Sequence, residues 1–323
     1  MKLLSNLYKS IASDFDIETQ EVNFIQDKLF LYGKGTLDVT KLFEKVPENR
    51  IKHIISMYYM GLLLYKNSST VKASMDKFIL KRWLFPTDDK SIEEKFEFLW
   101  MLTAFYHDVG YAYENEQVTC SSMIKQMSNY AYPFRGNYSY IPKCYDNELL
   151  NAYTWYRYIT SGRCDHGIAG AQKFYDDICK ADSYGRLKLP RVYRAVCLCI
   201  ACHNVWFPDN DTVGIYKAFG LGKLVDEFQK AVEGKVRIIC IEEHPLLFLL
   251  SLADNLEPCK RTGSLAVLNS IRMDISEDSI TVSTINKNCN QSYMNSISQL
   301  DKWLTDVEYK RTNEIVVKLL TSN

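Results

Sequence analysis

The feature that most constrains the fold is a series of apolar stretches with helical spacing between Asp38 and about Arg261. In "RIKHIISMYYMGLLLY", His53, Met57 and Met60 recur along one helical face. The other predicted helices are "SIEEKFEFLWMLTAFYHDVG", "DHGIAGAQKFYDDICK", "RVYRAVCLCIACHNVW" and "HPLLFLLSLADNLEP". These stretches predict a mainly α protein whose main part is a helical body.

The ends of these predicted helices carry recognisable signals. Ser91 and Glu94 form a capping box, and that helix is expected to end by Gly110. Asp165 precedes "HGIAGA", where an aspartate cap is followed by small residues that permit close packing. The last helix begins at a proline and is followed by Pro258, which cannot continue it.

After Arg261 the spacing changes from helical to alternating. The stretch "IRMDISEDSITVSTI" alternates apolar and polar residues around an acidic turn, which predicts a β-hairpin. A serine-capped helix is expected in "SYMNSISQLDKWL", and "EIVVKLL" fits either a strand or a terminal helix. We therefore expect two units: a helical domain over 1–265, with its core at about 50–261, and a small α+β subdomain over 266–323.

Composition limits the class of protein. Lysine plus arginine equals aspartate plus glutamate, at 39 each, which argues against a general nucleic-acid or membrane-surface binder. The N-terminus lacks the apolar segment of a secretory signal, and no window approaches the roughly 18 apolar residues of a membrane-spanning helix. The ten cysteines are irregularly spaced and fit reduced, buried thiols. We expect a cytoplasmic protein.

Six polar residues interrupt the apolar helices: His53, His107, Asp108, His166, His203 and Asp254. Burying an imidazole or a carboxylate is costly unless the group is hydrogen-bonded, paired or bound to metal. Any one of them alone fits a hydrogen-bonded core residue, but a shared metal centre satisfies all six together. The fifth histidine, His244, stands apart in "EEHPLL", and we expect it to be exposed or to cap a helix.

The order of these residues resembles the HD superfamily of metal-dependent phosphohydrolases. The matching phrases are "FYHDVGY", "DHGIAGA", "IACHN" and "SLADNLEP", and the resemblance covers roughly residues 50–261. It implies an HD-type helical bundle that binds two divalent ions of manganese, iron, zinc or magnesium. His53, His107 and Asp254 would bind the first ion, His166 and His203 the second, and Asp108 would bridge them as the catalytic carboxylate.

The implied reaction is hydrolysis of a small phosphorylated substrate, a phosphomonoester or phosphodiester such as a nucleotide, by a water activated between the two ions. Many phosphodiesterases of the superfamily carry His-Asp-x-Gly-Lys, whereas this chain has Tyr111 in place of the lysine. Other cations could contact the substrate phosphate. The candidates are Arg50, Arg163, Lys260 and Arg261.

Two other functions use the same residues. A mixed-valence di-iron oxygenase of the same superfamily would share all six ligands, and a binding module could hold the metal for structural reasons. The run Cys199-Ile-Ala-Cys-His203 also matches the C-x-x-C-H haem-attachment motif. Because His203 is better explained as a ligand of the metal centre, we expect no haem. Oligomerisation is compatible with each of these functions.

A tyrosine-rich region follows between Ser128 and Gly162, and we expect its first half to be a loop. It fits either an insertion that packs its own aromatic side chains or a lid over the substrate site.

Overall fold

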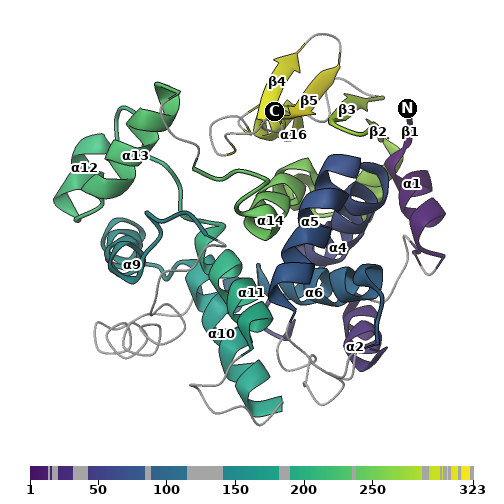
Figure 1. The fold of residues 1–323 in the computed structure, drawn as a ribbon, viewed down its shortest axis with the longest axis horizontal. Helices are drawn as coiled ribbons and strands as arrows, with labels where there is room; N and C mark the ends of the chain where they lie inside the picture. The colour runs from purple at the N-terminus through teal and green to yellow at the C-terminus, as the bar shows by residue number, and fades with distance from the viewer. Residues whose placement is uncertain are drawn as a thin grey trace.

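The computed structural model describes residues 1–13, 15–16, 21–31, 43–83, 89–114, 141–181, 190–234, 238–285, 291–298, 300, 304, 307–311 and 314–320. They form a mainly helical structure with a small antiparallel sheet (Figure 1). This confirms the mainly α class and the β structure expected near the C-terminus. The helices are α1 (Leu4–Ile11), α2 (Glu21–Leu31), α4 (Glu48–Asn67), α5 (Ser69–Arg82), α6 (Ile92–Tyr106), α7 (Tyr111–Glu114), α9 (Asn147–Ser161), α10 (His166–Ala181), α11 (Arg191–Cys202), α12 (Val213–Ala218), α13 (Gly222–Val232), α14 (Pro245–Leu256), α15 (Cys259–Thr262), the 3-10 helix η1 (Leu265–Asn269) and α16 (Gln291–Ile297).

The centre of the molecule is a group of apolar helices. α4 packs against α5, α6 and α14, while α11 packs against α6, α10 and α14. All twelve residues of α14 are buried, as expected for a helix that is apolar on every face. Gly61 of α4 lets α6 approach closely, because a Cβ there would lie 1.9 Å from the Trp100 ring. Trp100 then donates its indole N–H to the Tyr58 carbonyl at 2.8 Å.

The predicted helix ends are observed. Ser91 and Glu94 form the capping box at the start of α6. The Asp165 carboxylate accepts a hydrogen bond from the backbone N–H of Ile168 and so caps α10. α14 begins at Pro245, as its sequence predicts.

The five-stranded sheet has the order β1-β2-β3-β5-β4, with every neighbouring pair antiparallel. Its strands are β1 (Lys2–Leu3), β2 (Ile271–Ile275), β3 (Ser279–Thr284), β4 (Val307–Arg311) and β5 (Ile315–Leu319). The predicted hairpin is β2 and β3, and the ambiguous "EIVVKLL" run forms the strand β5. Alternate residues of β2, β3 and β5 are buried and form one apolar face; they are Ile271, Met273, Ile280, Val282, Ile315 and Val317.

The start of the chain also belongs to this sheet. β1 pairs with β2, placing Lys2 opposite Met273, so the N-terminal segment contacts the region beyond residue 265 (Figure 1). The domain boundary at residue 265 stays a prediction. Within the described part of the chain, none of the helices is both long and apolar enough to cross a membrane.

The tyrosine-rich region is described from residue 141 onward. Residues 128–140, where a loop is expected, lie outside the described residues. The second half forms α9, whose Tyr153 is buried and donates to the Asn204 carbonyl at 2.9 Å. Tyr156 of α9 lies 4.8 Å from Tyr216 of α12, ring centre to ring centre. These aromatic side chains therefore join α9 to the core and to α12.

Candidate metal centre

The six predicted residues come from five helices of the central group. His53 lies within α4, and Asp254 lies near the end of α14. His107 is the C-cap residue of α6, with Asp108 directly after it. The remaining two are His166, the first residue of α10, and His203, the C-cap residue of α11. Four of the six thus lie at helix ends, where the chain can turn a side chain inward without breaking a helix.

Glycines allow these helix ends to meet. A Cβ on Gly110 would lie 1.8 Å from the His166 carbonyl oxygen, and one on Gly170 would lie 2.6 Å from the Tyr106 carbonyl oxygen. Both distances are too short for any other residue without backbone movement. Gly110 and Gly170 therefore allow the turn after α6 to lie directly against the first turns of α10.

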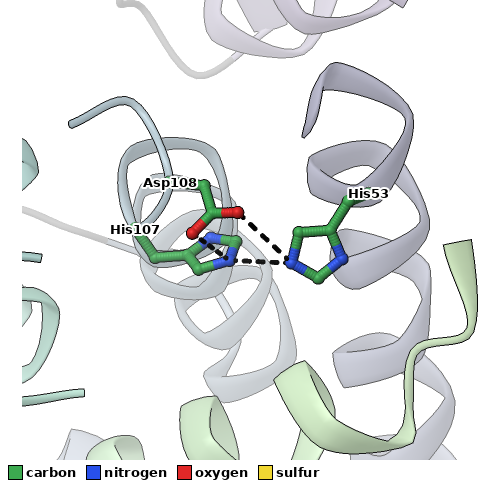
Figure 2. Close-up of side chains that lie close together, drawn as sticks. All are labelled: His53, His107 and Asp108. Carbon is green, nitrogen blue, oxygen red and sulfur yellow. Dashed lines mark hydrogen bonds and ion pairs between the residues drawn. The ribbon is translucent and has the colours of Figure 1, made fainter. Parts of the chain in front are cut away.

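The first group of side chains is His53, His107, Asp108 and Asp254. Figure 2 shows the two imidazoles facing each other, with 3.1 Å between their Nε2 atoms. His53 Nε2 lies 3.0 Å from Asp254 Oδ1 and 3.6 Å from Asp108 Oδ2. His53, His107 and Asp108 are fully buried, and their ligand atoms lie within 4.8 Å of one another.

The second group is Asp108, His166 and His203, and its ligand atoms also lie within 4.8 Å of one another. His166 Nε2 is 3.6 Å from Asp108 Oδ1. The ring centre of His203 is 5.4 Å from that of His166 and 5.4 Å from that of His107. Asp108 belongs to both groups, because its Oδ2 faces His53 while its Oδ1 lies between His107, at 3.5 Å, and His166.

Hydrogen bonds fix the orientation of three imidazoles. Nδ1 of His53 donates to Glu257 at 2.5 Å, Nδ1 of His107 to the Ala104 carbonyl at 2.8 Å, and Nδ1 of His203 to the Ile200 carbonyl at 2.6 Å. With Nδ1 engaged in this way, Nε2 of each ring is directed toward the cluster. Such bonds are typical around the histidine ligands of metal sites.

Three buried atoms of the second group lack a hydrogen-bond partner among the described residues: Asp108 Oδ1, His166 Nε2 and His203 Nε2. Leaving a buried polar atom unpaired costs about 1–3 kcal/mol. Three such residues, whose ligand atoms lie within 4.8 Å of one another, fit a cation held between them, and a carboxylate with two imidazoles suits manganese, iron or zinc. The donor set therefore fits a metal ion.

The pKa of His53 is shifted in the opposite direction to the pKa values of His166 and His203. Burial alone would lower the pKa of His53, but bonds to Asp254 and Glu257 and the charge of Asp108 raise it to about 9. Burial lowers the pKa of His203 to about 4, and it also lowers the pKa of His166 well below its ordinary value. The second group therefore offers neutral imidazoles at neutral pH, whereas His53 binds a proton that a metal ion would replace.

The carboxylates of the centre remain ionised. Burial raises the pKa of Asp108, but the nearby charges of His107, Lys260 and His53 outweigh it and hold this pKa below its ordinary value. Burial also raises the pKa of Asp254. The Lys260 ammonium is the largest of the causes that lower it, and together they hold this pKa well below its ordinary value. Ionised carboxylates are the form that binds metal.

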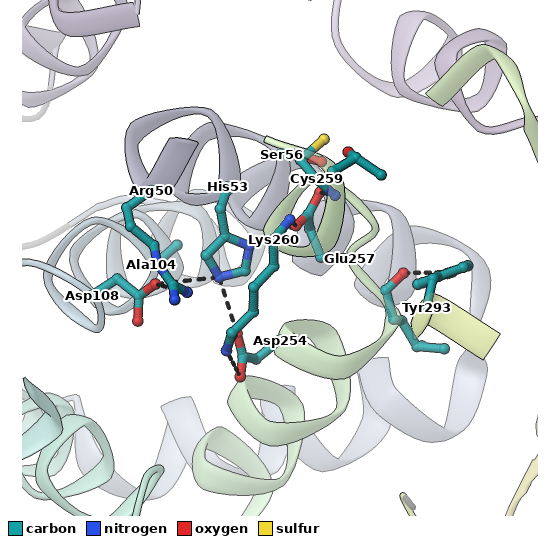
Figure 3. Close-up of polar contacts among 12 residues, drawn as sticks. Arg50, His53, Ser56, Ala104, Asp108, Asp254, Glu257, Cys259, Lys260 and Tyr293 are labelled. Carbon is teal, nitrogen blue, oxygen red and sulfur yellow. Dashed lines mark hydrogen bonds and ion pairs between the residues drawn. The ribbon is translucent and has the colours of Figure 1, made fainter. Parts of the chain in front are cut away.

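Two of the four cations proposed as phosphate contacts lie at this centre. Lys260 Nζ contacts both oxygens of Asp254, and an Arg50 guanidinium nitrogen lies 3.4 Å from Asp108 Oδ2 (Figure 3). Arg163 and Arg261 are exposed, and neither bonds to a ligand of the centre among the described residues.

Three supporting residues were not predicted. Glu257 is buried and bonds His53, but it lies after the end of α14, where an exposed glutamate is ordinary. Tyr111 stacks on the His166 ring at 4.0 Å, and the Arg50 guanidinium lies 4.0 Å from the same tyrosine ring. Asn204 donates to the Asp165 carboxylate at 2.6 Å, directly beside His166. Two of the three carried a signal in the sequence: Tyr111 stands where many phosphodiesterases of the resembled family have a lysine, and Asn204 is adjacent to His203.

A small hollow adjoins the centre, with room for about one water molecule. Its lining residues are Tyr145, Cys202, His203, Val205, Trp206, Phe207, Ile239, Ser251, Asp254 and Asn255. Because His203 and Asp254 form part of its wall, a molecule in this hollow would reach the metal centre. The other lining residues offer mainly aromatic and apolar surface.

His244 lies outside this centre, as predicted, but it is not exposed. It occupies the N-cap position of α14 without a side-chain capping bond, and only 6% of its surface is accessible. Its Nδ1 lies 3.5 Å from the Cys240 backbone nitrogen and 3.8 Å from the Cys240 sulfur. Of the two alternatives expected from the sequence, exposure was wrong, because the segment before α14 is folded against the core, whereas a position at the start of a helix is observed.

The structure thus brings the predicted polar residues together in one candidate metal centre. Buried His53, His107, Asp108, His166 and Asp254 form it with His203 at its edge. Comparisons of the chain with protein-family models, curated proteins and solved structures find no match.

Proposed function

We propose that the chain is a metal-dependent phosphohydrolase with an HD-type helical bundle and two divalent ions. The observation that carries the proposal is the position of Asp108 between the two groups of histidines. Its Oδ2 lies 3.6 Å from His53, and its Oδ1 lies 3.5 Å from His107 and 3.6 Å from His166. A carboxylate shared in this way fits a pair of ions. The converging unpaired atoms of Asp108, His166 and His203 support the second ion.

In this proposal His53, His107 and Asp254 hold one ion, His166 and His203 hold the other, and Asp108 contacts both. Divalent ions in such a site act as Lewis acids toward water and toward the oxygens of a phosphoester. Glu257 orients His53 by accepting its Nδ1 proton, and the Ala104 and Ile200 carbonyls do the same for His107 and His203.

The cations of the chain would orient the substrate phosphate. Arg50 is 20% exposed, so its guanidinium can contact both Asp108 and a bound ligand. Stacking on Tyr111 holds the guanidinium in place and assigns a role to the residue that replaces the family's lysine. The structure leaves only a small hollow beside His203 and Asp254. The proposal of a small phosphoester substrate, such as a nucleotide, therefore rests on the metal centre and its cations.

The test is metal content and phosphoester hydrolysis of the purified chain. The protein is stripped with chelator, reloaded with Mn²⁺, and assayed on p-nitrophenyl phosphate, bis-p-nitrophenyl phosphate and nucleoside monophosphates. We expect nearly two ions per chain and turnover of at least one ester. Asp108→Asn should lose both, while the matched control Asp226→Asn, on the exposed face of α13, should keep both.

The alternatives give different results in the same experiment. Two irons with a visible chromophore and oxygen uptake would identify the oxygenase. Metal binding without turnover of any ester or consumption of oxygen would indicate a structural metal in a binding module. A chain that binds no metal would contradict the proposal.

A further inference from the structure

Lys260 places its ammonium group directly on a residue of the metal centre. Its Nζ lies 2.7 Å from Oδ1 and 2.6 Å from Oδ2 of Asp254, and its side chain is only 12% exposed (Figure 3). Asp254 Oδ1 is also the atom that lies 3.0 Å from His53 Nε2. Both oxygens of a carboxylate that would bind a metal ion are therefore occupied by a cation of the chain itself.

An ammonium in this position opposes the binding of an adjacent divalent ion. An ion held by Asp254 would lie within a few ångströms of Nζ, and like charges repel each other at that distance in a partly buried site. Metal binding by Asp254 must therefore displace the ammonium or proceed against this repulsion. The backbone of Lys260 can stay in place, because its N–H donates to Glu257 Oε2 at 2.9 Å independently of the side chain.

The other cation of the centre is held differently. Arg50 makes a single contact of 3.4 Å with Asp108 and stacks on the Tyr111 ring, so its position depends only partly on the carboxylate. No aromatic ring is recorded against Lys260 among the described residues, and its four-carbon stem is flexible. Lys260 is therefore the cation that can leave when an ion binds.

We propose that Lys260 is a built-in counter-cation that holds Asp254 in the ion-free chain and competes with the first divalent ion for this carboxylate. The inference rests on the proposed metal centre, and it adds a role that metal ligation alone does not include. It implies that the affinity of the first ion is set partly by a residue that does not bind it. It also implies that ion binding frees an ammonium group beside the place where a phosphate would lie.

The first test compares ion affinity in two variants without any substrate. Lys260→Met keeps most of the stem but removes the charge, whereas Arg261→Met removes an exposed charge from the next position of α15. Mn²⁺ binding is measured by calorimetry or equilibrium dialysis. We expect Lys260→Met to bind the first ion about tenfold more tightly than wild type, because the competing charge is gone. Arg261→Met should bind as wild type does. Equal or weaker binding by Lys260→Met would overturn the inference.

The second test uses the wild-type chain, so it does not depend on the folding of a variant. Lysine acetylation by an N-hydroxysuccinimide ester is followed by peptide mass spectrometry with chelator and with saturating Mn²⁺. Lys77, an exposed residue of α5, serves as the internal reference. We expect acetylation of Lys260 relative to Lys77 to rise severalfold when Mn²⁺ is bound, because the amine leaves Asp254. An unchanged or lower ratio would contradict the inference.

These tests separate failure of the inference from failure of the proposed hydrolase. Tighter Mn²⁺ binding by Lys260→Met without turnover of any phosphoester would reject the hydrolase and keep the role of Lys260. Turnover of a phosphoester by the wild type, with the Mn²⁺ affinity of Lys260→Met unchanged, would keep the hydrolase and reject the role of Lys260. If neither wild type nor Lys260→Met binds Mn²⁺, Fe²⁺ or Zn²⁺, both proposals are wrong.

Discussion

Substitutions of His203 and Asp108 are predicted to differ in their effect on ion content, because Asp108 belongs to both groups of side chains and His203 only to the second. His203 approaches the second group, with its unpaired Nε2 near Asp108 Oδ1 and His166 Nε2. We expect His203→Ala to keep the first ion and lose most of the second, giving close to one metal per chain by elemental analysis. Loss of both ions, or retention of both at wild-type affinity, would contradict the assignment of His203 to the second ion.

Another residue-level prediction concerns pH and His244. Burial lowers its pKa to about 4, below the ordinary value near 6.5 that it regains on unfolding. Between these values the unfolded chain binds more protons, so His244 makes the fold less stable as pH falls through this window. Between pH 7 and pH 5 the loss should be about 1–2 kcal/mol. Urea unfolding at both pH values should show a smaller loss for His244→Gln, and an identical loss would argue against this role.

Residues of the candidate metal centre could be predicted from the sequence where a polar residue interrupts an apolar helix. His53 and Asp254 lie inside apolar helices, so a shared metal explained them better than separate accidents. Glu257 bonds His53 just as closely, yet it follows the end of a helix and precedes a proline, where glutamate needs no explanation. The Tyr111 stack depends on where α7 meets α10, which no local spacing reveals.

At the level of elements, the turn after α6 lies so close to the start of α10 that Gly110 is predicted to accept no larger residue without loss of stability. A Cβ at Gly110 would meet the backbone at 1.8 Å, so Gly110→Ala must move one of the two segments. We expect a loss of roughly 1–3 kcal/mol in the free energy of unfolding, together with weaker binding of the second ion. Urea unfolding and Mn²⁺ titration measure these two effects.

Gly214 in α12 provides the matched control. A Cβ there would meet nothing within 4 Å, and alanine is favoured over glycine within a helix. Gly214→Ala should therefore leave ion binding unchanged and stabilise the fold by about 0.5–1 kcal/mol. If Gly110→Ala were equally harmless, the close contact between α10 and the turn would not be what positions His166.

Whether a strand could be predicted from the sequence depended on its length and on its pairing partners. β2 and β3 alternate over enough residues to identify a hairpin, whereas β1 has two residues, too few to show any alternation. β5 could not be distinguished from a helix by its short apolar run, and pairing with β3 and β4 determines its structure. The sheet is thus defined by partners that lie far away in the sequence.

At the scale of the whole molecule, five helices from residues 48 to 256 meet at one centre, so metal binding should stabilise the entire helical group. An ion that binds only the folded chain adds about 2.7 kcal/mol at a free concentration 100 times its Kd. We expect Mn²⁺ to raise Tm by several °C relative to chelator-treated protein in calorimetry. Asp108→Asn should lose this increase, because it removes the carboxylate that both groups share, while Asp226→Asn should retain it. An increase of equal size in Asp108→Asn would place the stabilising ion elsewhere, and no increase in wild type would mean that the helices are held together without metal.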